Sequence, residues 1–106
     1  LVWTEHVAEM SDLSPAEQRH CFNILMAVEV AVRECFRPEK VNLASFGNMV
    51  PHLHWHVIPR YLDDRHFPQP VWGQPQRKGG ASPAPEVDDA RLALAIRNAV
   101  AEHLSG

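Results

Sequence analysis

Residues 52–58 read His-Leu-His-Trp-His-Val-Ile, so histidine alternates strictly with apolar residues before a final isoleucine. Because side chains of a β-strand point alternately to its two faces, this spacing predicts a strand from His52 to Ile58, with Pro51 and Pro59 marking its ends. The three imidazoles would line one face of the strand, and the apolar side chains on the other face would pack against a helix.

The residues upstream predict that helix and a second strand. Ser14 can cap a helix that begins at Pro15, and Glu17 completes a capping box. Apolar residues then recur at near-helical spacing as far as Pro38, which predicts a long amphipathic helix. Its apolar positions are Phe22, Leu25, Met26, Val28, Val32 and Phe36. Residues 41–46 predict a strand.

Downstream of the histidines the periodicity is lost. Residues 60–85 are rich in Pro, Gly, Gln and Arg, which predicts a long loop or arm. Asp88 and Asp89 then open a final helix whose apolar residues share one face. This order is typical of an α+β fold, with an antiparallel sheet, a long helix and a C-terminal helix in a single domain over residues 1–106.

Length, charge and cysteine usage narrow the classes of protein. The chain of 106 residues suits one domain, and no stretch approaches the about 20 apolar residues that a membrane span needs. The net charge is −3 and the basic residues are scattered, so we expect neither a nucleic-acid nor a membrane partner. Cys21 and Cys35 lie about 21 Å apart on the predicted helix, too far to pair. We expect them to pack as small hydrophobic residues in a reduced, cytoplasmic protein.

Three explanations fit a row of histidines on one strand face. The first is a solvated face without a function. The second is a metal site: His52 and His56 would lie about 13 Å apart, so all three cannot easily reach one ion, although two of them could with His6 or an acidic residue. The third is phosphoryl-type chemistry, in which a neutral imidazole attacks phosphorus while an acceptor on its other nitrogen fixes the tautomer. Neighbouring imidazoles would then supply hydrogen-bond donors and a proton.

The stretch at 52–58 resembles the signature of the histidine-triad (HIT) family of nucleotide hydrolases and transferases. The flanking Pro59-Arg60 is similar to the branch that hydrolyses dinucleoside polyphosphates. Residues 1–14 are similar to the strand end, histidine and helix start that precede the family's first long helix, although Trp3-Thr4-Glu5 replaces the usual Pro-Lys or Pro-Arg pair. The strands and helix that the family places earlier are absent. With no initiator methionine, we expect an N-terminally incomplete domain.

The resemblance implies a role for each of four histidines. His54 is the expected nucleophile, which forms a covalent nucleotidyl intermediate at the α-phosphate. His56 would contact the phosphoryl oxygens and assist the leaving group. His52 and the outlying His6 would form the supporting hydrogen-bond network.

Further residues complete the implied site. Asn48 falls where the family places a glutamine or similar group near the phosphates, and Asn42 resembles the asparagine of the preceding strand. A turn residue after Gly47 is an equal alternative for Asn48. His66 and Trp72 of the arm could close over the site, but packing or a solvated loop is the favoured interpretation of both.

The resemblance implies a nucleotide hydrolase that acts on dinucleoside polyphosphates or nucleotide phosphoramidates. A nucleotidyl transferase and a nucleotide-binding regulatory protein with little turnover are the alternatives. No metal or other cofactor is implied, and Mg²⁺ would enter only as a counter-ion of the substrate. Because members of the family often pair, a homodimer is compatible with the resemblance.

Overall fold

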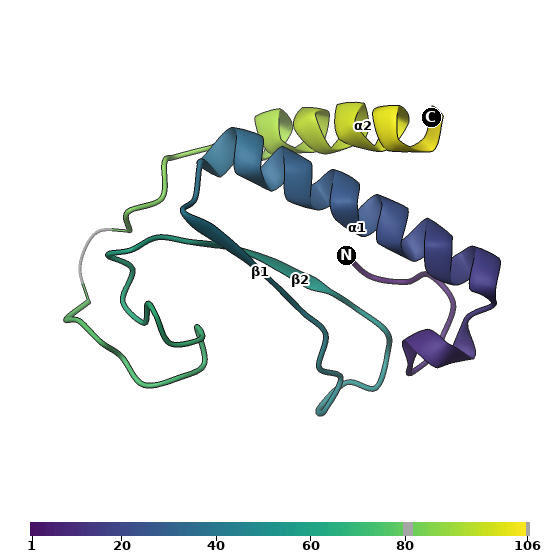
Figure 1. Ribbon diagram of the computed structural model, residues 1–106, viewed down its shortest axis with the longest axis horizontal. Coiled ribbons are helices and arrows are strands. Elements are labelled where there is room, and N and C mark those ends of the chain that lie inside the picture. The colour runs from purple at the N-terminus through teal and green to yellow at the C-terminus, as the bar shows by residue number, and fades with distance from the viewer. Residues whose placement is uncertain (80–81, 106) are drawn as a thin grey trace.

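The fold is described by a computed structural model for residues 1–79 and 82–105. Its elements, in chain order, are the short 3-10 helix η1 (Met10–Asp12), α1 (Pro15–Phe36), β1 (Lys40–Ala44), β2 (His56–Arg60) and α2 (Asp89–Ser105). The two strands pair in antiparallel fashion, and α1 lies between this hairpin and α2 (Figure 1). The expected α+β architecture, with an antiparallel sheet, a long helix and a C-terminal helix, is confirmed.

Both helices begin where local signals in the sequence predicted. The Ser14 side chain accepts a hydrogen bond from the backbone N–H of Glu17 at 3.2 Å, and the Glu17 carboxylate accepts one from the backbone N–H of Ser14 at 2.8 Å. This capping box satisfies amides that have no partner inside the helix. In α2 the Asp88 side chain caps the backbone N–H of Arg91 at 2.7 Å. No helix of the described residues has the length and apolar character needed to cross a membrane.

Two different hydrophobic clusters lie along α1. The aromatic cluster consists of Leu13, Cys21 and Leu53, with Trp3, Val7, Met10 and Trp55 packed around them. The alanine cluster consists of Ala27, Ala31 and Ala99, with Ala95, Ile96 and Val100 packed around them. The first joins α1 to the histidine stretch, and the second joins α1 to α2. Both cysteines are buried and unpaired, which confirms that they pack as small hydrophobic residues.

The single strand predicted from His52 to Ile58 is wrong in its extent. β2 begins only at His56, whereas His54 makes an isolated antiparallel bridge with Val2 and His52 lies in a bend. The reason is a change of partner. The backbone of residues 53–55 bonds to residues 1–3 and 7, and the chain from His56 onward pairs with β1 on the opposite edge.

Pro59 was expected to end the strand, but it lies inside β2 opposite Val41. Odd-numbered residues of this stretch direct their N–H groups to the outer edge, as Leu53 and Trp55 do toward the N-terminal segment. Within the hairpin, Pro59 and Val41 face each other as a pair that exchanges no backbone hydrogen bonds, so a proline at position 59 removes no hydrogen bond to β1.

The predicted alternation of faces is confirmed. Leu53 is only 4% exposed and packs, with Trp55, into the aromatic cluster against α1. The arm is confirmed as well, since its described residues contain no helix or strand after Arg60. Residues 80 and 81 of the arm lie outside the described residues.

Candidate active site

His54 is oriented by the backbone of its own stretch. Its Nδ1 lies 2.6 Å from the carbonyl oxygen of His52. A carbonyl oxygen can only accept, so Nδ1 carries the proton and Nε2 keeps its lone pair in the neutral ring. The arrangement leaves one nitrogen of a half-buried imidazole free for nucleophilic attack.

His52 and His6 form a second hydrogen-bonded pair. Nε2 of His52 lies 2.5 Å from the carbonyl oxygen of Trp3, so this nitrogen is the donor. In the neutral ring Nδ1 of His52 is then an acceptor, and it lies 3.1 Å from Nδ1 of His6. His6 therefore donates to His52, which donates to Trp3. The structure brings His6 and His52 together across 46 positions of sequence.

His56 opens β2 on the same face and is exposed. Its ring centroid lies 5.3 Å from that of His54, with the planes at 79°, and 6.1 Å from that of Phe46. An exposed imidazole can exchange protons with solvent and is free to meet an incoming ligand. Contacts thus connect all four histidines singled out from the sequence.

The two asparagines are placed differently. Asn42 pairs with Ile58 in the hairpin, so it shares the face of His56, and its Oδ1 accepts a hydrogen bond from Nη1 of Arg60 at 2.8 Å. Asn48 is exposed in the connection between β1 and β2, next to Gly47 with its φ of 77°. Among the described residues, no contact joins Asn48 to the histidines.

Arg60 is a structural centre that sequence reasoning treated only as a flanking residue. Its side chain is buried, with the residue 2% exposed. Nε and Nη2 donate to the two carboxylate oxygens of Asp64 at 2.9 and 3.1 Å, and Nη2 also donates to the carbonyl of Gln69 at 2.7 Å. We call Arg60, Asp64, Asn42 and Gln69 the arginine hub. The spacing of four between Arg60 and Asp64 was the only signal in the sequence.

Asp64 also organises the backbone of the arm. Its carboxylate accepts hydrogen bonds from the backbone N–H groups of Tyr61, His66 and Phe67. The Arg60 guanidinium, helped by these amides, holds the pKa of Asp64 well below its usual range. The first turns of the arm are therefore ordered by charge and by backbone hydrogen bonds.

The arm returns to the histidine face through Trp72. Its ring lies 4.8 Å from that of Phe46 at 84°, and Phe46 in turn contacts His56. Of the two arm residues that could close over the site, Trp72 thus comes next to it. The contacts described for His66 are backbone bonds to Asp64 and Gln69.

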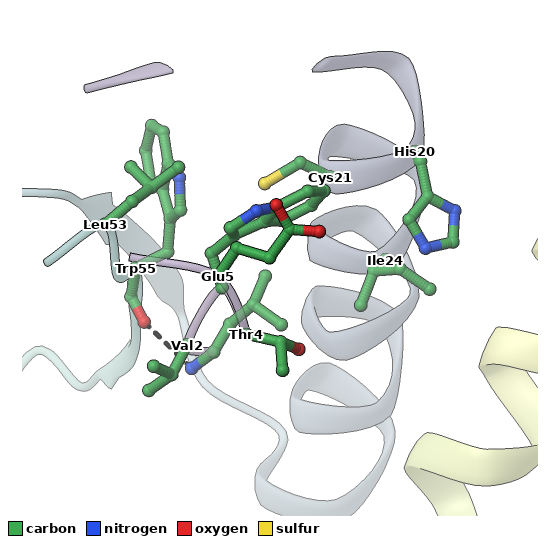
Figure 2. Close-up of a pocket in the computed structure, with 10 residues that line it drawn as sticks. Val2, Thr4, Glu5, His20, Cys21, Ile24, Leu53 and Trp55 are labelled. Atoms are coloured by element: carbon green, nitrogen blue, oxygen red, sulfur yellow. Dashed lines mark hydrogen bonds between the residues drawn. The ribbon is translucent and has the colours of Figure 1, made fainter. Parts of the chain in front are cut away.

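A cavity of about 230 Å³ lies on the opposite side of the histidine stretch, against α1. Figure 2 shows Leu53 and Trp55 on one side of it and His20, Cys21 and Ile24 of α1 on the other. Burial raises the pKa of the Cys21 thiol, so it stays protonated near neutral pH and is no competing nucleophile. Four members of the aromatic cluster line the cavity, namely Trp3, Cys21, Leu53 and Trp55, whereas His52, His54 and His56 do not.

Within residues 1–79 and 82–105, no group of three His, Cys, Asp or Glu side chains is placed to hold a metal ion. His6 and His52 approach each other as a hydrogen-bonded pair. The described side chains at the histidine face therefore form a series of hydrogen-bond donors and acceptors.

The comparisons with known proteins point to one family. A family model described as the HIT domain matches residues 1–63, which include every histidine of the site. Bis(5'-adenosyl)-triphosphatase of Saccharomyces cerevisiae is 33% identical over 60 residues, which cover 52% of this chain and 29% of the yeast protein. The chain thus spans less than a third of the length of the curated relatives it matches.

Solved structures agree with this match. A histidine triad protein from Bradyrhizobium japonicum is similar with a TM-score of 0.63 and 29% identity, over 94% of this chain and 69% of that one. One from Marinobacter aquaeolei VT8 is similar with a TM-score of 0.63 and 28% identity, over 96% of this chain and 69% of that one. The similarity therefore extends beyond the histidine stretch to both helices and the hairpin.

Proposed function

The chain belongs to the HIT domain family, and from this we propose that it hydrolyses nucleotide phosphoanhydrides or phosphoramidates at the α-phosphate through a covalent bond to His54. The observation that carries the proposal is the hydrogen bond from Nδ1 of His54 to the carbonyl of His52. It leaves Nε2 as the only nitrogen of that ring with a free lone pair. The name of the yeast relative supports a dinucleoside polyphosphate as the substrate.

In the first step Nε2 of His54 forms a bond to the α-phosphorus, and the bond from phosphorus to the leaving group breaks. Positive charge develops on the imidazole, and the carbonyl of His52 stabilises it through the Nδ1–H bond. His56, beside the His54 ring, donates a proton to the leaving atom. In the second step water displaces His54 from phosphorus, and His56 takes up a proton from that water.

His52 and His6 act as positioning residues in this proposal. Donation from His52 to the carbonyl of Trp3 fixes the bend from which the His52 carbonyl reaches His54. The Trp3 carbonyl fixes the tautomer of His52, and His6 donates to the ring nitrogen of His52 that remains an acceptor. Asn42 keeps an amide N–H group for a phosphate oxygen while its Oδ1 is bound to Arg60. Asn48, which is exposed in the connection between β1 and β2, remains a proposed phosphate contact.

The stereochemistry at phosphorus tests the covalent role of His54. Hydrolysis, in isotopically labelled water, of a dinucleotide with a chiral α-phosphorothioate should give net retention, because two displacements invert the centre twice. Net inversion would show a single attack by water and overturn the covalent step. The same assay after exhaustive chelation is the control: activity should persist, because His54 supplies the nucleophile without a metal-generated hydroxide.

A further inference from the structure

Two large aromatic side chains stay exposed beside the histidines. Phe46 is 49% exposed and Trp72 is 59% exposed, although the two rings contact each other at 4.8 Å. Adjacent exposed aromatic residues next to a site are a common mark of a ligand-binding surface. They also continue a row of rings that begins at His54 and passes through His56.

We propose that Phe46 and Trp72 form a stacking subsite for the base of the leaving nucleotide; this inference rests on the proposed function. An in-line attack by His54 drives the leaving group away from that nitrogen, toward the imidazole that protonates it, which is His56. The row of rings continues from His56 to Phe46 and then to Trp72. The leaving nucleotide therefore extends along these aromatic side chains.

The geometry of the two rings suits a planar ligand. Their planes meet at 84°, so they form a corner rather than a closed stack. A nucleobase can lie flat on one ring while its edge meets the face of the other, which is a favourable arrangement for aromatic pairs. Stacking of this kind accepts any base, because every base has a π-face.

Space for the rest of a nucleoside lies next to Trp72. An open cavity of about 690 Å³ runs along β1, and Asn42, Ala44 and Trp72 are among its lining residues. Its volume falls in the usual range of about 300–1,000 Å³ for small-ligand sites. Asn42 and Ala44 lie on the same face of the hairpin as His56, because they pair with Ile58 and His56 itself.

Trp72 is held in place rather than carried on a free loop. It lies in a turn closed by a hydrogen bond from the N–H of Gly73 to the carbonyl of Pro70 at 2.8 Å. Just before this turn, the carbonyl of Gln69 binds the buried Arg60. A preformed platform loses little conformational entropy when a base stacks on it.

The experiment compares two substrates that transfer the same nucleotide. Diadenosine tetraphosphate has a base on its leaving group, whereas adenosine 5'-phosphoramidate releases only ammonia. Trp72→Leu should raise KM for the dinucleotide about tenfold and leave KM and kcat for the phosphoramidate within about twofold. Leu62→Ala is the matched control, because Leu62 lies on the same arm and is 58% exposed but outside the row of rings.

Each outcome has a clear meaning. Equal kinetics of Trp72→Leu and the parent on both substrates would overturn the subsite and leave the proposed function intact. An equal loss on both substrates would also overturn it, because Trp72 would then act only by supporting the fold. If neither substrate were turned over, the proposed function would be overturned, and a binding measurement would then test the subsite. A non-hydrolysable dinucleotide should quench the tryptophan fluorescence of the parent and not that of Trp72→Leu, and equal quenching would overturn the subsite.

Discussion

The two ends of β2 carry polar groups that are used in opposite ways. At the first end, each histidine ring of the site makes at most two hydrogen bonds within the described residues, and Nε2 of His54 stays free. At the other end, the Arg60 guanidinium donates four hydrogen bonds and the Asp64 carboxylate accepts five. Arg60 and His56 lie on the same face of the hairpin.

The difference distinguishes residues that take part in catalysis from residues that stabilise the fold. A side chain whose donors and acceptors are all used inside the protein has nothing left to offer a substrate, whereas a fixed ring with one free lone pair does. Substitutions at the histidine end should therefore change turnover with little effect on unfolding. Substitutions of Arg60 or Asp64 should do the reverse.

The largest effect is expected at His54. His54→Ala should lower kcat by at least about 10⁴-fold, because it removes the group that bonds to phosphorus, and should leave nucleotide affinity within a few-fold. Steady-state kinetics with calorimetric binding measure the two quantities, and thermal unfolding should be unchanged. Substantial hydrolysis by the purified variant would show that another residue is the nucleophile.

The second effect is on stability. Asp64→Asn should lower the free energy of unfolding by about 3 kcal/mol, because Arg60 would stay buried without a counter-charge. Both oxygens of the Asp64 carboxylate accept hydrogen bonds. In either orientation of the asparagine amide, its NH₂ group would therefore face N–H donors that now meet an oxygen. Chemical denaturation measures the loss. Asp63→Asn is the matched control on an adjacent, exposed carboxylate and should change stability by no more than about 0.5 kcal/mol.

Lowering the pH tests the same comparison through the charge of Asp64. Since the pKa of Asp64 is lowered in the folded state, its stabilising effect is complete above the unfolded pKa of about 4 and is lost as pH falls further. The difference in free energy of unfolding between the parent and Asp64→Asn should therefore shrink from pH 6 to pH 2. A difference that stays constant over this range would exclude the charge of Asp64 as its cause.

The smallest effect is expected at His6, which acts through His52. His6→Ala should lower kcat about tenfold, the equivalent of one hydrogen bond, with KM little changed. His6→Asn should recover part of the activity, because its amide N–H can occupy the position of Nδ1. A loss as large as that of His54→Ala, with no recovery by asparagine, would give His6 a direct part in the chemistry.

Local signals predicted the parts of the fold that local chemistry determines. The capping box at Ser14 and the stop at Pro38 placed α1, and the alternation at 52–58 assigned the faces correctly. The start of β2 could not be predicted, because it depends on where pairing with β1 begins and not on the residues of the stretch itself. The arginine hub was missed for a similar reason. Asp64 accepts most of its hydrogen bonds from backbone amides, and such bonds cannot be predicted from the pattern of side chains.

The hydrogen bonds at His52 have a consequence for how the molecule gains its activity. Its partners, Trp3 and His6, lie 49 and 46 positions away, whereas α1 and the β1–β2 hairpin form from neighbouring residues. Closing such long loops costs more chain entropy than forming a helix or a hairpin. A chain in which α1 and the β1–β2 hairpin have already formed would therefore still lack an ordered histidine network. Competence for catalysis would arise only when residues 1–7 come to rest beside Leu53 and Trp55.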